Sequence, residues 1–98
     1  QLSNNQLLLV KEIWKYQKEN KLNKVVIGRN GVIFDDAKKK PTAINLISKI
    51  SIPEGDYFRF EELILSVPTF FLGQISETRW GNPYVVTVPE EARELLDE

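Results

Sequence analysis

The sequence predicts a small α+β domain, and three observations support this prediction. The 98 residues are 42% hydrophobic and 10% aromatic, an ordinary composition for one folded domain. Apolar residues recur with helical spacing near both ends of the chain. Between them, two β-branched runs flank an Asn-Gly pair, which is typical of a hairpin. We therefore expect one compact domain over residues 1–98, in which two hairpins pack against helices.

The first element is predicted to be a helix from Ser3 to about Asn20. Ser3 and Gln6 have the spacing of a capping box, in which each side chain bonds the other residue's backbone N–H. The apolar residues that follow recur at i, i+3 and i+4, as one buried helix face requires. These residues are Leu9, Val10, Ile13 and Trp14.

A hairpin is predicted next, with strands at residues 24–28 and 32–34. Asn30-Gly31 favours a type I′ turn, because both residues tolerate positive φ. Residues 35–40 are expected to form a charged, exposed loop. Apolar residues then recur with helical spacing between 43 and 50, so we expect a helix that begins at Pro41.

The second half contains one ambiguous segment and two further strands. Residues 57–65 fit either a strand or a short helix that ends before Pro68. Residues 69–75 and 84–88 are predicted as strands, joined by a longer loop. The last helix should begin at Pro89, with two glutamates in its first turn. We expect its buried side to be Ala92, Leu95 and Leu96. The predicted order is α-β-β-α-(α)-β-β-α.

Charge is divided along the chain rather than mixed. Residues 1–49 contain ten Lys and Arg against four acidic residues, a net charge of +6. Residues 50–98 contain three Arg against ten acidic residues, a net charge of −7. Such an asymmetry points to charged partners and does not identify a reaction.

The basic residues of the first half predict a surface that binds the phosphate backbone of nucleic acid. Lysine predominates over arginine in it, which argues against bidentate reading of bases. A solvated face that serves only solubility is the alternative, and an acidic protein partner is a third. The candidate nucleic-acid-binding residues are Lys11, Lys15, Lys18, Lys24, Arg29, Lys38, Lys39 and Lys40.

The acidic half predicts a protein interface. Arg79, Trp80 and Tyr84 are residue types that anchor interfaces, although Trp80 as a lid on the core is the simpler interpretation. Glu90, Glu91 and Glu94 would form an acidic helix face that meets a basic protein, or the basic half of a second copy. A solvated helix face explains these three glutamates equally well.

One enzymatic alternative was considered. The strand at 32–34 is followed by Asp36-Ala37-Lys38, which resembles the second half of the motif of PD-(D/E)xK nucleases. That resemblance implies a metal site completed by an acid such as Glu12 or Glu19. The acid that this family carries on the preceding strand is missing at 23–25, so we expect no enzyme and no catalytic residue.

The missing residue types exclude several chemistries. The chain has no Cys and no His, so disulfides, thiolate zinc sites and Ser-His pairs are impossible. We predict no cofactor, no bound metal and no membrane segment, and an intracellular, cytoplasmic location. The chain begins at Gln1 and lacks Met, which is consistent with a fragment of a longer protein.

The C-terminal third resembles a known module. Val67-Pro68 and Phe70, then Trp80-Gly81 and Pro83, then Pro89 with Ala92 and Leu95-Leu96 are similar to the small B domain of archaeal GINS replication subunits. The chain lacks the Gly-Asp residues usual before the next strand, and residues 1–50 do not resemble the helical domain that accompanies this module. The resemblance implies a non-catalytic docking role in DNA replication.

We therefore expect a non-enzymatic binding and assembly module with a basic and an acidic face, which docks protein in a nucleic-acid-associated complex. The first alternative is a free-standing nucleic-acid-binding protein of viral or archaeal type. The second is a metal-dependent nuclease, active or degenerate, centred on Asp36 and Lys38.

Overall fold

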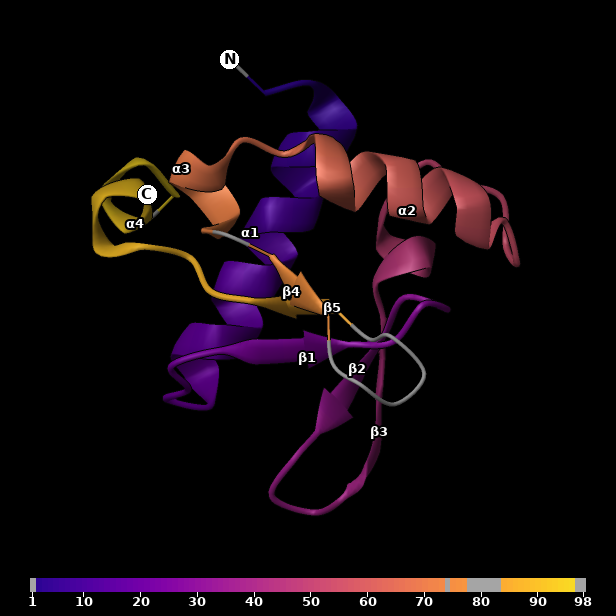
Figure 1. Ribbon diagram of the computed structural model, residues 1–98, viewed down its shortest axis with the longest axis horizontal. Helices are drawn as coiled ribbons and strands as arrows, with labels where there is room; N and C mark the ends of the chain where they lie inside the picture. The colour runs from indigo at the N-terminus through magenta and orange to yellow at the C-terminus, as the bar shows by residue number, and fades with distance from the viewer. Residues whose placement is uncertain (1, 74, 78–83, 97–98) are drawn as a thin grey trace.

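The computed structural model describes residues 2–73, 75–77 and 84–96 (Figure 1). It confirms the α+β class. In chain order the elements of the described part are α1 (Asn4–Glu19), β1 (Val25–Ile27), β2 (Val32–Asp35), β3 (Lys40–Asn45), the 3-10 helix η1 (Leu46–Lys49), α2 (Tyr57–Ser66), α3 (Thr69–Leu72), β4 (Ser76–Glu77), β5 (Tyr84–Val86) and α4 (Glu90–Leu96).

The described strands form one antiparallel sheet in the order β3-β2-β1-β5-β4. Its centre is the pairing of β1 with β5, in which Val25 lies opposite Val86 and Ile27 opposite Tyr84. This contact joins the meander of the first half to the hairpin of the second half. The two oppositely charged halves therefore share one sheet.

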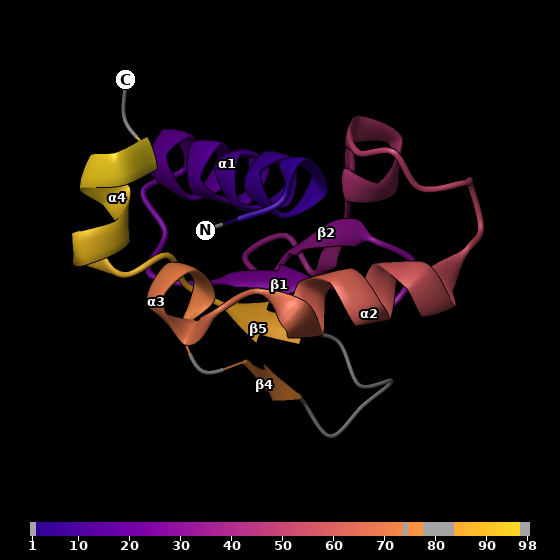
Figure 2. The same ribbon diagram turned by 90° about the horizontal axis from the view of Figure 1, so that it is seen from above.

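The helices lie mainly toward one side of this sheet. Figure 1 shows α2 and α3 above β1, β4 and β5, whereas the β2–β3 hairpin extends away from them. Figure 2 shows α1 alongside the strands, with α4 next to its C-terminal end. None of the helices in the described part of the chain is both long enough and apolar enough to cross a membrane.

The core follows the alternation of side chains along β1, β2 and β5. Val25, Ile27, Ile33, Tyr84 and Val86 are buried, while the intervening strand residues are half-exposed. The Phe60 ring of α2 packs edge-on against the Tyr84 ring, with centroids 6.2 Å apart. Leu9, Val10 and Ile13 of α1 complete one apolar cluster.

Helix α1 confirms the first prediction. Ser3 donates its backbone N–H to Gln6 Oε1 at 2.8 Å, and Gln6 N–H donates to Ser3 Oγ at 3.3 Å. This is the capping box that the spacing predicts.

One buried polar side chain ties α1 to the strand end that leads to α4. Gln17 is 1% exposed, and its Oε1 accepts the backbone N–H of Val88 at 3.1 Å. Its Nε2 donates to Thr87 Oγ1 at 3.2 Å. The Thr87 hydroxyl in turn donates to the carbonyl oxygen of Asn23. The amide therefore fixes the end of α1 against both the β1 entry and the β5 exit.

The β1–β2 hairpin is confirmed, but its turn is not type I′. Of the Asn30-Gly31 pair only Gly31 has positive φ, at +82°. Gly31 N–H donates to Gly28 O, and Gly28 N–H donates to Val32 O, each at 2.9 Å. This is a three-residue loop with the glycine at its last position. A Cβ on Gly31 would also meet Ile47 Cγ1 at 2.8 Å, so both φ and space require glycine.

The predicted helix from Pro41 to 50 is wrong. Residues 40–45 form β3, and the helical part is confined to η1. The sheet supplies the reason: β2 has a free edge, and β3 completes it with Lys40 opposite Asp35 and Pro41 opposite Phe34. Proline is tolerated because β3 is the outermost strand.

The strand predicted at 69–75 is also wrong. Thr69–Leu72 is a helical turn, and it ends at Gly73, whose φ is +65°. Gly73 N–H donates to Thr69 O at 2.7 Å, and Leu72 is fully buried. The ambiguous segment 57–65 is helical, and the predicted last strand is shorter, ending at Val86.

Candidate functional site

The outer side of α1 carries three lysines. Because Leu9, Val10 and Ile13 face the core, the side chains of Lys11, Lys15 and Lys18 are exposed. A rise of 1.5 Å per residue spreads them over about 10 Å along the helix axis. The Lys18 ammonium also lies 5.5 Å from the centroid of the Trp14 ring.

The β2–β3 turn carries Lys38 and Lys39, and β3 begins with Lys40; all three lysines are exposed. Lys39 adopts the left-handed conformation, with φ at +55°, and its Nζ lies 3.6 Å from Asp36 Oδ1. Asp35 Oδ1 accepts the backbone N–H of Lys38 at 3.2 Å. Lys24, which directly precedes β1, is also exposed.

The turn and the C-terminal half of α1 lie at the same end of the molecule. Burial raises the pKa of Tyr16, and the charge of Asp35 raises it further. In Figure 1 the β2–β3 turn and the C-terminal end of α1 both lie in the lower part of the molecule. We call the exposed lysines of this end the lysine surface: Lys11, Lys15, Lys18, Lys24, Lys38, Lys39 and Lys40.

Arg29 does not belong to the lysine surface. It lies in the β1–β2 turn, at the other end of β1 from Lys24. Its Nη1 is 3.8 Å from Glu61 Oε2 on α2. The structure therefore separates Arg29 from the lysines with which the sequence groups it.

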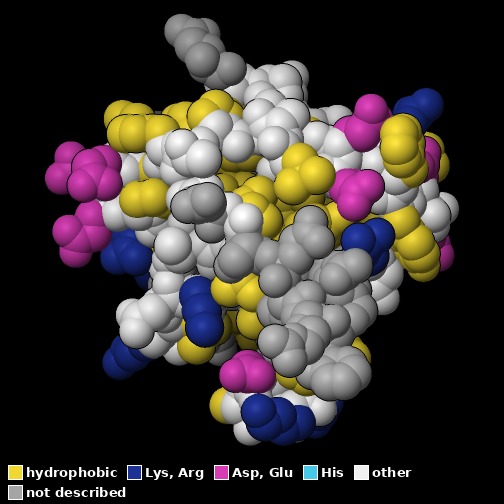
Figure 3. Space-filling model, viewed as in Figure 1, with side chains coloured by type: hydrophobic (Ala, Val, Ile, Leu, Met, Phe, Trp, Pro, Cys, Tyr) yellow, Lys and Arg dark blue, Asp and Glu magenta, His cyan; other side chains and the backbone are white. Residues whose placement is uncertain are grey.

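The outer face of α4 is acidic. Glu90, Glu91 and Glu94 are exposed, and Leu95 is 59% exposed beside them, so the prediction that Leu95 is buried is wrong. Arg93 turns inward: its Nε donates to Val88 O at 2.9 Å, and its Cζ lies 4.8 Å from the Trp14 ring centroid. Figure 3 shows acidic side chains gathered over α4, with basic side chains directly below them.

Tyr84 does not provide a surface ring. It is 1% exposed, packs against Phe60 and donates its hydroxyl to Glu61 Oε2 at 3.1 Å. The expectation that Tyr84 anchors a partner is corrected, because β5 is a central strand and this position faces the core. Arg79 and Trp80, which were predicted with it, lie outside the described residues.

The Asp36-Ala37-Lys38 segment lies in the exposed β2–β3 turn. Glu12 is half-buried and Glu19 exposed on α1. Within residues 2–73, 75–77 and 84–96, no group of three or more Asp, Glu, His or Cys side chains is placed to hold a metal ion. No observation in the described residues adds to the nuclease hypothesis.

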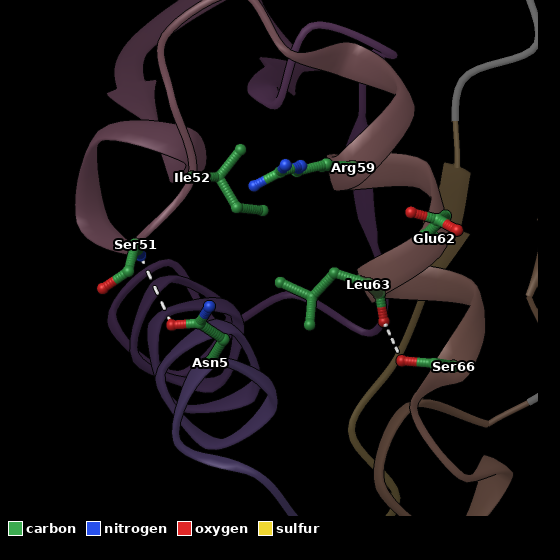
Figure 4. A pocket seen from close by; sticks show the side chains of 7 residues that line it. All are labelled: Asn5, Ser51, Ile52, Arg59, Glu62, Leu63 and Ser66. Carbon is green, nitrogen blue, oxygen red and sulfur yellow. Dashed lines mark hydrogen bonds between the residues drawn. The ribbon is translucent and has the colours of Figure 1, made fainter.

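Two hollows adjoin α2 that the sequence did not suggest. One, of about 460 Å³, lies between α2, the start of α1 and the segment after η1 (Figure 4). The other, of about 230 Å³, lies between α2 and the β1–β2 turn, beside the exposed Tyr57 and Phe58 rings. The i, i+7 spacing of Phe58 and Leu65, both exposed, is a signal that could have marked an outward helix face.

Comparison with known proteins adds no relative: no family model, curated protein or solved structure matches this chain. The resemblance of the C-terminal third to the GINS B domain therefore stays a prediction.

Proposed function

We propose that this chain is a non-enzymatic binding module that contacts the phosphate backbone of nucleic acid through the lysine surface and docks protein through the outer face of α4. One observation carries the proposal. The lysines of α1 and of the β2–β3 hairpin are exposed, and the C-terminal end of α1 and this hairpin both lie in the lower part of Figure 1, whereas the exposed glutamates lie on α4. Opposite charges that are separated in space can serve two partners at once.

The lysine surface fits a phosphate backbone better than base edges. Lysine ammonium groups are point charges on flexible stems, whereas guanidinium forks read guanine edges. The arginine of the first half is occupied with Glu61 at the opposite end of β1. Binding should therefore depend weakly on sequence and strongly on salt.

The outer face of α4 fits a basic protein segment. Glu91, Glu94 and Leu95 share one helix face, because their spacings are i+3 and i+4. An exposed leucine among carboxylates offers an apolar contact inside a charged rim, which is the usual anatomy of a protein interface. The same face would repel phosphates. A docking role is also what the GINS resemblance implies.

The test is fluorescence anisotropy with labelled duplex and single-stranded oligonucleotides at 50 and 200 mM salt. The variant replaces Lys11, Lys15 and Lys18 with Gln, and the matched control replaces Glu90, Glu91 and Glu94 with Gln. The wild type should bind at low salt, the lysine variant should bind at least tenfold more weakly, and the control should bind no more weakly than wild type. Failure of the wild type to bind at 50 mM salt overturns the nucleic-acid part of the proposal.

The protein part is tested by the partners recovered from cells that make this protein. Crosslinking in the cell with a photoreactive residue at position 95 should capture a basic protein, and the Glu90, Glu91 and Glu94 to Gln control should reduce the yield. If the captured species is a second copy of the chain, the module self-associates. If nucleic acid binds and no protein is captured, the free-standing alternative replaces the docking role.

A further inference from the structure

The groove beside α2 is an open hollow that polar and apolar side chains line together. Its volume of about 460 Å³ lies within the range of small-molecule sites. Figure 4 shows Arg59 and Leu63 projecting from α2 into the same space as Ile52 from the opposite wall, with Asn5 of α1 below. Three segments distant in sequence therefore converge on it.

Arg59 is held in place by a single carboxylate. Asp56, the N-cap of α2, accepts the backbone N–H of Arg59 on Oδ1 at 3.1 Å. Its Oδ2 lies 3.3 Å from Arg59 Nε. Because Asp56 engages the Nε edge of the guanidinium, the terminal Nη groups extend across the groove toward Ile52 (Figure 4). A planar guanidinium held in this way is suited to a bidentate carboxylate contact.

Asn5 supplies a second donor from below. Its Oδ1 accepts the backbone N–H of Ser51 at 3.3 Å, and this bond decides which end of the amide is oxygen. The amide nitrogen then points into the groove (Figure 4). The guanidinium and this amide approach the same space from two different elements.

The walls of the groove are apolar and braced. Ile52 and Leu63 are partly buried and pack against the core with one face, which leaves the other face for a ligand. Gln6 Nε2 donates to Ser66 Oγ at 3.0 Å and to Ser66 O at 3.3 Å, which ties the start of α1 to the end of α2. The two helices that form the groove are thus fixed relative to one another.

We propose that this groove binds a monocarboxylate with an adjacent branched apolar group, as the C-terminal residue of a peptide presents it. The carboxylate lies between the Nη groups of Arg59 and the Nδ2 of Asn5, and the apolar group packs between Ile52 and Leu63. Asp56 and Glu62 adjoin Arg59, so the three side chains carry a net charge of −1, which repels a dianion more strongly than a monoanion. Phosphate is therefore disfavoured at this groove, unlike at the lysine surface.

The test is an NMR titration of the folded, ¹⁵N-labelled chain with four probes. These are acetyl-Ala-Ala-Leu with a free carboxylate, the same peptide as its C-terminal amide, 4-methylpentanoate and inorganic phosphate. The free-acid peptide should shift the amide signals of residues 5, 51–52, 59 and 62–66 with millimolar affinity. The amide should bind at least tenfold more weakly, and phosphate should not shift these signals.

Binding by 4-methylpentanoate as tight as that of the free-acid peptide would assign the site to a small carboxylic acid instead of a chain terminus.

Arg59→Gln should weaken free-acid binding at least tenfold, and Arg59→Lys should weaken it less, while both keep the dispersed spectrum of the fold. Arg29→Gln, which alters the arginine of the other hollow, is the matched control and should bind as wild type does. Equal binding of acid and amide, or shifts confined to the lysine surface, overturns the proposal.

Discussion

Helices α1 and α4 meet at Trp14, a residue of α1, yet they distribute their charges in opposite ways. Lys18 of α1 and Arg93 of α4 both approach the Trp14 ring, at 5.5 and 4.8 Å from its centroid. On α1 the lysines face outward, and the inward polar residue is the neutral Gln17. On α4 the glutamates face outward, whereas the basic residue Arg93 turns inward.

This difference explains why the basic and acidic residues, which are separated along the sequence, are also separated between the two helices in the folded chain. Arg93 would offset the α4 glutamates if it pointed outward, but the Val88 carbonyl and the Trp14 ring hold it at the inner side. The outer face of α4 therefore stays acidic although Arg93 directly precedes Glu94 in the sequence. On α1, a neutral amide in the core position leaves every charge on the helix at or near the surface.

The largest expected effect tests whether the outward lysines of α1 act as the binding face. Reversing Lys11, Lys15 and Lys18 to Glu should weaken nucleic-acid binding by about 1000-fold or more at 0.1 M salt, since each lost phosphate contact removes about one power of ten there. Anisotropy over a salt series measures this, and replacing the three lysines with Gln should reduce the slope of log K against log salt by about 3. An unchanged slope would place the nucleic acid elsewhere.

The next effect tests the inward side of α1. Gln17→Leu should lower the free energy of unfolding by about 2 kcal/mol, because it leaves the buried Val88 N–H without its acceptor. Urea denaturation followed by circular dichroism measures the change. Lys15→Ala is the control on the outer side and should change stability by less than about 0.5 kcal/mol. Equal effects for the two variants would contradict the structural role of Gln17.

A smaller effect tests the inward cation of α4. Arg93→Ala should cost about 1 kcal/mol, since it removes one hydrogen bond and one cation–π contact. Arg93→Lys keeps the cation but loses the Nε donor, and it should recover part of the loss. Trp14 fluorescence during urea denaturation reports both variants. If Arg93→Lys were as destabilised as Arg93→Ala, the ring contact would contribute nothing.

The smallest effect concerns Tyr16, which joins the two parts of the lysine surface. Burial and the nearby Asp35 raise its pKa above 10.0 in the folded state, so the neutral phenol is favoured by folding. The stabilisation is complete below the unfolded pKa and is lost as pH rises through the folded pKa. Tyr16→Phe should therefore lose less stability than wild type above pH 10, as thermal melts between pH 8 and 11 would show. Parallel pH profiles would contradict a raised pKa of Tyr16 in the folded state.

The sequence was sufficient to predict those elements whose interactions lie within a few neighbouring residues. Ser3 and Gln6 form their capping box within one turn, the β1–β2 hairpin follows from its glycine turn, and Pro89 precedes α4 as predicted. Gly73 also carried a local signal, a helix end, which an interpretation of 69–75 as a strand overlooked. The lysines of α1 and the glutamates of α4 are exposed because helical spacing alone separates them from the apolar face.

Other features depend on partners distant in the chain. Residues 40–45 become a strand because β2 offers an unpaired edge, although their apolar spacing suits a helix. Tyr84 is buried and Arg29 leaves the lysine surface because β1 pairs with β5 beneath α2. The groove at Arg59 exists because Gln6 and Asn5 of α1 meet α2 and the segment after η1.

Composition and spacing thus establish the α+β class, the ends of the first and last helices, the outward lysines and glutamates, and the absence of thiol and imidazole chemistry. The tertiary structure decides which charged side chains lie close together and where the grooves on the surface form. The physical reason is the sequence separation of the residues that interact. A capping box or an amphipathic face involves residues within a few positions, whereas a sheet edge or a groove is shaped by residues that the linear order keeps tens of positions apart.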